Sequence, residues 1–111
     1  MRRISPLLAV LLALASAPAT ATFHLMSIRE VYVGPAGDPN AQYVELQMYF
    51  AGQNRVDNHV IRFYDAAGTQ IGPDLTFTDD VPNGANQDYI LIATTQAVTK
   101  FGVAADLVMA A

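Results

Sequence analysis

The chain has 111 residues, no cysteine and a formal net charge of −4 at pH 7. The lack of cysteine excludes disulfides, cysteine-based zinc sites and lipid attachment to a cysteine. The few basic residues are scattered, which argues against binding to the phosphate backbone of nucleic acids or to an anionic membrane surface.

Residues 1–21 have the three parts of a secretory signal peptide. Arg2 and Arg3 form a basic start, residues 7–15 (LLAVLLALA) are apolar, and residues 19–21 (ATA) have the spacing that signal peptidase accepts. An apolar helix over residues 7–15 is too short for the ~30 Å hydrocarbon core of a bilayer. We therefore expect cleavage after Ala21, a secreted, periplasmic or extracellular location, and no transmembrane anchor.

Removal of residues 1–21 from the 111-residue chain leaves 90 residues, which suffice for one domain with one core. Residues 22–111 contain ten acidic and four basic residues, so their net charge is −6. Nucleic acid is accordingly not expected as a partner of this domain.

The first two expected strands lie on either side of a loop at residues 34–41. Residues 23–33 are rich in β-branched and aromatic residues, and their alternation becomes regular only if a bulge occurs near Arg29-Glu30. Residues 42–50 (QYVELQMYF) alternate cleanly and are expected to direct four apolar side chains into a core: Val44, Leu46, Met48 and Phe50.

Residues 59–65 and 69–78 are expected to pair as a hairpin. The turn between them, Asp65 to Gly68, has Asp first and Gly last, as in a type I turn that closes with a left-handed glycine. Pro73 predicts an edge or a break in the second strand. The side chains expected to point inward are Ile61, Phe63, Ile71, Leu75 and Phe77.

Residues 87–93 (QDYILIA) are apolar on both faces and predict a central strand. A short helix should follow over residues 96–101, with Thr94 or Thr95 as its N-terminal cap and Gly102 as its stop. Five strands and one short helix predict an all-β sandwich or partial barrel. The abrupt end after another apolar segment suggests that further strands are missing and that a sheet edge is exposed.

Three segments in the right order resemble the lamin tail domain family, in its bacterial secreted form. They are residues 28–31 (IREV), residues 43–46 (YVEL), and residues 89–93 (YILIA) followed by a helix that ends in Phe101-Gly102. The resemblance covers most of residues 23–102. Gln47-Met48 stand where the family has an Asn, and the chain stops before the family's last strands, so the domain is interpreted as truncated at the C-terminus.

This resemblance implies an immunoglobulin-like β-sandwich over residues 22–111. It also implies a binding or interaction module, which occurs in surface and secreted proteins and sometimes beside nucleases. The family carries no catalytic motif to transfer. We accordingly expect a non-enzymatic domain without a cofactor.

The candidate binding residues are Glu30, Tyr43, Glu45 and Tyr49. The alternation of residues 42–50 places Glu45 on the outer face of its strand, where it could simply be solvated, with Arg29 or Arg62 as a cross-strand partner. If Glu30 and Glu45 instead lie on neighbouring strands, the two carboxylates could point together at a cation. Outward tyrosines could bind a sugar or a protein.

The acidic loop at residues 79–88 is the candidate calcium site, through Asp79, Asp80 and Asn83. Compared with an EF-hand loop it lacks an oxygen ligand at the third and twelfth positions, where Val81 and Ile90 stand. An ordinary solvated turn explains the same residues.

The sequence thus predicts an exported binding module of the cell envelope or exterior, with a protein or carbohydrate ligand. Two alternatives remain. One is a calcium-assisted accessory domain of a secreted hydrolase or nuclease, with Glu45, Asp79 and His59 at a metal. The other is a structural fragment of a larger protein. The oligomeric state is not determined by the sequence.

Overall fold

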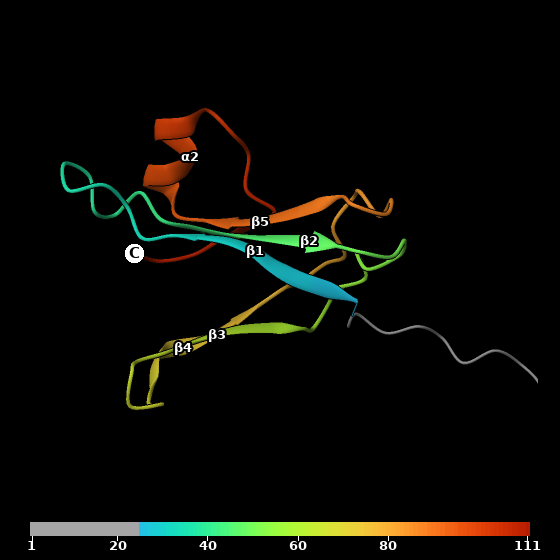
Figure 1. Cartoon of the computed structure of the whole chain (residues 1–111), viewed down its shortest axis with the longest axis horizontal. Coiled ribbons are helices and arrows are strands. Elements are labelled where there is room, and N and C mark those ends of the chain that lie inside the picture. The colour runs from blue at the N-terminus through green and yellow to red at the C-terminus, as the bar shows by residue number, and fades with distance from the viewer. Residues whose placement is uncertain (1–24) are drawn as a thin grey trace, which may run out of the picture.

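A computed structural model describes residues 25–111, so the expected signal peptide at residues 1–21 lies outside the described residues. The described chain forms two sheets and one short helix (Figure 1). The elements in chain order are β1 (Met26–Tyr32), β2 (Tyr43–Met48), β3 (Val60–Tyr64), β4 (Gln70–Thr76), β5 (Tyr89–Ala93), α2 (Thr95–Phe101) and β6 (Leu107–Val108).

The larger sheet has the strand order β1-β2-β5-β6. β1 and β5 both run antiparallel to β2, and β1 changes register between Ile28 and Glu30. This irregularity confirms the bulge that the broken alternation of residues 23–33 predicts. Because of it, Ile28 and Val31 both lie opposite inward-facing residues of β2, namely Leu46 and Val44.

β2 and β5 supply most of the core. Val44, Leu46 and Met48 are buried on one face of β2, as their alternation predicts, and Ile90 and Ile92 are buried beside them on β5. β5 lies between β2 and β6, so the prediction of a central strand is confirmed.

Phe50 is the exception in the predicted alternation. It was expected to point into the core, but it is 59% exposed. β2 ends at Met48, and the chain turns through Gly52, whose φ is +86°. Beyond the end of a strand the two-residue period no longer determines which way a side chain points.

The smaller sheet is the hairpin of β3 and β4, and its turn confirms the prediction at Asp65 to Gly68. The Gly68 N–H donates to the carbonyl of Asp65 at 3.0 Å, and the Asp65 carboxylate accepts from the N–H groups of Ala67 and Thr69. Gly68 adopts φ +83°, a left-handed conformation that suits glycine.

The pairing of β3 and β4 is irregular around Pro73. Ile61 lies opposite Leu75, whereas Phe63 lies opposite Ile71, so β4 uses two more residues than β3 between these pairs. Phe77 and Leu75 reach the core as predicted, but Ile71 is 57% exposed. Ile71 lies opposite the partly buried Phe63 and so shares its inner face as predicted, but it remains more than half uncovered.

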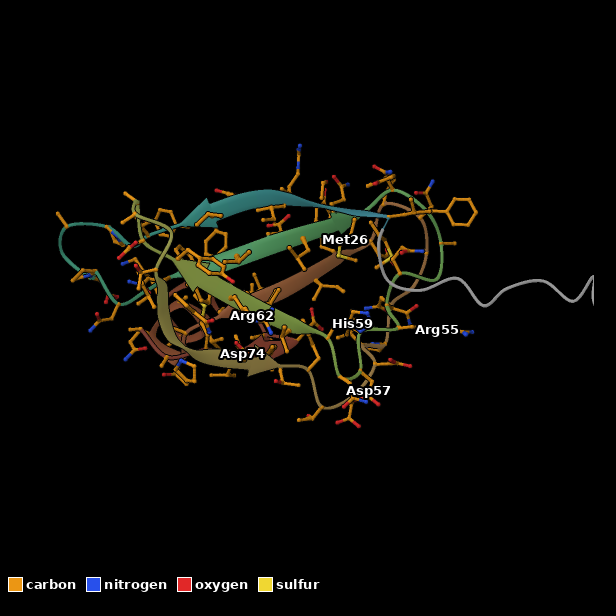
Figure 2. The ribbon with its side chains drawn as sticks, turned by 90° about the horizontal axis from the view of Figure 1, so that it is seen from below. Met26, Arg55, Asp57, His59, Arg62 and Asp74 are labelled. Atoms are coloured by element: carbon orange, nitrogen blue, oxygen red, sulfur yellow. The ribbon has the colours of Figure 1, made fainter. Side chains whose placement is uncertain are left out.

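Arg62 and Asp74 hold this irregular stretch from opposite strands (Figure 2). The Arg62 guanidinium donates two hydrogen bonds to the Asp74 carboxylate, at 2.8 and 2.9 Å, and Gln70 donates a third at 2.8 Å. The hydrogen bond from Arg62, followed by that from Gln70, lowers the pKa of Asp74 to about 2. Arg62 is thus engaged in the smaller sheet and is not the cross-strand partner of Glu45 that the sequence suggested.

Helix α2 is capped at both ends by the residues that the sequence indicates. The Thr94 hydroxyl accepts a hydrogen bond from the Ala97 N–H, and Gly102 follows with φ +64°. After the helix the chain returns as β6, which pairs in parallel with β5. The sequence had indicated only an apolar segment there, because a parallel partner reached through a helix leaves no local turn signal.

Apolar side chains pack in two places. The main core lies between the two sheets, and a second cluster of Ala41, Ala93 and Ala97 lies where α2 covers the opposite face of the larger sheet (Figure 1). The described residues are therefore mostly β, in two layers compatible with a sandwich. Among them, no helix is long and apolar enough to cross a bilayer.

Candidate functional site

The outer face of the larger sheet brings two carboxylates together. Glu30 of β1 lies directly opposite Glu45 of β2, and Tyr32 lies opposite Tyr43 one step along the outer face. Directly opposed residues of antiparallel strands share a face and stand about 5 Å apart. Three of the four predicted binding residues, Glu30, Tyr43 and Glu45, therefore form one group.

Helix α2 adds a third ring to this group. The Phe101 ring centroid lies 5.8 Å from that of Tyr32 and 5.9 Å from that of Tyr43, both in edge-to-face arrangement. The Tyr32 and Tyr43 centroids are 5.2 Å apart. These separations are in the favourable range for aromatic pairs. The rings build a platform beside the carboxylates, and Phe101 is 45% exposed.

Tyr43 connects the rings to the carboxylates. The Glu30 carboxylate lies close enough to the Tyr43 hydroxyl to act on its ionisation. Burial raises the pKa of Tyr43 above 10.0, and the Glu30 carboxylate and the charge of Glu45 raise it further. The two carboxylates and the phenol are thus electrostatically coupled in one group.

Glu45 is half-buried on this face, with Leu91 of β5 opposite on its other side. Within residues 25–111 neither Glu30 nor Glu45 forms an ion pair. Two like charges directly opposite each other on neighbouring strands destabilise the pairing of those strands. A cation or a set of hydrogen-bond donors supplied from outside would relieve that repulsion.

Toward the C-terminal end of β2, the outer face of the larger sheet also carries polar side chains. The Gln47 side-chain amide donates to the Gln87 side chain at 3.1 Å and to the Tyr89 hydroxyl at 3.2 Å. Tyr49 lies apart from the group of Glu30, Tyr43 and Glu45. It follows the end of β2, at the opposite end of the strand from Tyr43, and its N–H donates to the Leu25 carbonyl.

The acidic loop makes contacts that are typical of turns. The Asp80 carboxylate accepts from the Asp57 N–H at 3.0 Å, and Asp79 is 3.5 Å from the Thr78 hydroxyl. Asn83 is exposed at the same loop. In the part of the chain that the structure describes, no three His, Cys, Asp or Glu side chains gather as a metal-holding group.

In the alternative metal set, His59 and Asp79 lie at the same end of the smaller sheet, where the Phe77 N–H donates to the His59 carbonyl, but Glu45 lies on the other sheet. Glu45 lies on the outer face of the larger sheet, Asp79 follows β4, and His59 precedes β3. His59 accompanies Arg55 and Asp57 near the start of the smaller sheet (Figure 2). The structure does not gather these three residues into a metal-holding group.

Sequence reasoning did not single out Tyr32 and Phe101. Tyr32 follows Glu30 by two residues and so shares its face, a signal that the sequence does contain. Phe101 reaches the group only because α2 folds back over the sheet. A partly open apolar cavity of about 480 Å³ was also not expected; its lining includes Phe63, Ile71, Leu75 and Met109.

Comparisons with models of known protein families, with characterised proteins and with solved structures found no match to this chain.

Proposed function

We propose that the chain is an exported, non-catalytic binding module of the cell envelope or exterior. It contacts a protein or carbohydrate through the outer face of the larger sheet. The observation that carries this proposal is the adjacency of Glu30, Glu45 and Tyr43, with two more rings beside them.

The chemistry of this face favours a protein ligand that presents a basic side chain. A Lys or Arg placed between the two carboxylates would neutralise two opposed charges, and its alkyl or guanidinium part would lie near aromatic rings. A carbohydrate could use the same rings for stacking and the same carboxylates as hydrogen-bond acceptors, and it is the second ligand class to test.

We also propose that the two layers form an immunoglobulin-like sandwich similar to the lamin tail domain. The three resembling segments occupy β1, β2 and the β5–α2 unit, and the first two pair side by side. They supply the carboxylates, and the third supplies Phe101. The resemblance and the candidate site thus concern the same part of the molecule.

The proposal is tested by applying the purified full-length gene product to an array of basic peptides and to a glycan array. We expect binding to basic peptides that weakens as salt rises, because the carboxylates are partly exposed. Glu45→Gln should weaken binding by about tenfold, since hydrogen bonds to charged groups are among the stronger polar contacts.

Asp79→Asn is the matched control, because it removes the same charge from an exposed loop elsewhere and should leave the affinity unchanged. Circular dichroism should show the same β content for all proteins. Absence of binding to both arrays by a folded protein, or equal losses for the two variants, would contradict the proposal.

A further inference from the structure

β1 is an edge strand with an exposed apolar side. It is the first strand of the larger sheet and pairs only with β2 within the described residues. Ile28 is 68% exposed, Val31 58% and Val33 73%. Seen from the side of the smaller sheet, β1 lies beside β3 and β4 and not beneath them (Figure 2). Such an edge is a template for another strand.

The bulge decides which strand could fit. Residues three apart on a regular strand point to opposite faces. On β1 the bulge places Ile28 and Val31 on the same inner face, opposite Leu46 and Val44 of β2. Ser27 and Tyr32 likewise share the outer face, opposite Gln47 and Tyr43. Residues at equal distances on either side of the Arg29-Glu30 bond therefore share a face: Ile28 with Val31, and Ser27 with Tyr32.

We propose that a second copy of this chain pairs its β1 with this β1, antiparallel, about a two-fold axis between Arg29 and Glu30. In this register Arg29 of each copy lies opposite Glu30 of the other. Ile28 lies opposite Val31, and Ser27 opposite Tyr32. These two flanking pairs each join residues of the same face, and the interface is self-complementary, as a two-fold contact requires.

Charge selects this register over its neighbours. A two-fold axis at Glu30 would place Glu30 opposite itself, and an axis at Arg29 would place Arg29 opposite itself and Ile28 opposite Glu30. Like charges in direct opposition destabilise strand pairing, and opposite charges stabilise it. The register centred between the two residues forms two Arg–Glu pairs and places apolar side chains against each other. It extends the sheet across the dimer.

The first test measures self-association of the purified full-length gene product by sedimentation at increasing concentration. We expect a reversible dimer. Arg29→Glu should weaken it by about tenfold or more, because the introduced carboxylate then faces Glu30 of the other copy. The double variant R29E/E30R exchanges the two charges, recreates both opposite-charge pairs and should restore the dimer.

Val108→Lys is the matched control at the other edge of the same sheet. Val108 of β6 is 52% exposed, and its substitution should leave the dimer intact. A protein that stays monomeric throughout the concentration range would overturn the proposal. So would a dimer that Arg29→Glu does not weaken, or one that V108K weakens equally.

The second test reads the register directly and uses the absence of cysteine from the chain. In the double variant I28C/V31C, the thiol introduced at the first position lies opposite the thiol at the second position of the other copy, so mild oxidation should give a covalent dimer. In I28C alone the two introduced thiols are three residues out of register, about 10 Å apart, which is too far for a disulfide. Equal cross-linking of both variants, or cross-linking of neither, would contradict the register.

Discussion

At the level of single residues, Tyr43 is the side chain whose environment reports on the candidate site. Its hydroxyl responds to the Glu30 carboxylate of the neighbouring strand, and its ring packs against Tyr32 and Phe101. Any change that separates β1 from β2, or α2 from the sheet, alters one of these contacts. The ionisation of its hydroxyl is therefore a direct probe of the site.

We expect Glu30→Gln to lower the pKa of Tyr43, because the variant removes a negative charge next to the phenol and replaces the carboxylate by a neutral amide oxygen, which is a weaker acceptor. The pKa should stay above 10.0, since burial is the largest cause of the rise. Glu45→Gln should lower it less, because Glu45 acts on Tyr43 through charge alone. Ultraviolet difference titration in a background where the other four tyrosines are replaced by Phe measures this value.

An unchanged Tyr43 pKa in E30Q would show that the hydroxyl does not contact the carboxylate in solution. Equal effects of E30Q and E45Q would show that charge alone acts on Tyr43. Either result would require a different arrangement of the site.

At the level of elements, Thr94 connects three segments. Its buried hydroxyl accepts from the Ala97 N–H at the start of α2 and from the Gln42 N–H before β2, both at 3.1 Å. It donates to the Asn40 carbonyl at 2.6 Å. The sequence predicts the cap, but not that the same hydroxyl also ties the loop before β2 to the helix.

Thr94→Ala should lower the free energy of unfolding by roughly 2–3 kcal/mol, because it removes a helix cap and leaves the buried Ala97 N–H without its acceptor. Thr94→Ser retains the hydroxyl and should cost less than about 1.5 kcal/mol, the upper end for removal of one buried methyl group. Urea denaturation compares the two variants. Equal losses in both would show that the methyl group, and not the hydroxyl, is responsible.

Elements were predictable where their signals are local. The bulge at Arg29-Glu30, the turn from Asp65 to Gly68 and the stop at Gly102 each depend on a few consecutive residues. Phe50 was misplaced because the end of β2 depends on the turn that follows it. The missed strand β6 depends on a partner that lies on the far side of a helix.

At the level of the whole molecule, the two layers do not overlap fully. The smaller sheet has only two strands against four in the larger one. The layers bury Ile90 completely, whereas Ile28 on the edge strand is 68% exposed. The same residue type thus lies in two different environments of one sheet.

We expect Ile90→Ala to cost about 2–5 kcal/mol of unfolding free energy, since it removes buried methyl groups and leaves a cavity. Ile28→Ala should cost about 0.5 kcal/mol or less when the protein is dilute enough to be monomeric. Thermal or urea denaturation of both variants measures the difference. Similar losses at the two positions would indicate that β1 is covered in solution.

The site could be predicted in part for the same reasons as the fold. Glu30, Tyr43 and Glu45 were found because alternation assigns a face to each residue of a strand. Tyr49 was included by the same rule but lies beyond the strand's end. Alternation does not predict which strand pairs with β2. It therefore could not predict whether Glu45 would lie opposite an arginine or another carboxylate.

The sequence by itself determined the strand-forming segments, their buried faces, the bulge, the hairpin turn and the helix caps. These follow from backbone sterics and from the period of apolar side chains, which act over a few residues. Only the tertiary structure decided that Glu30 faces Glu45, that Phe101 joins the tyrosines and that the inner side of β1 is left uncovered. Those features depend on strand order and on how far one layer extends over the other, which contacts between distant segments determine.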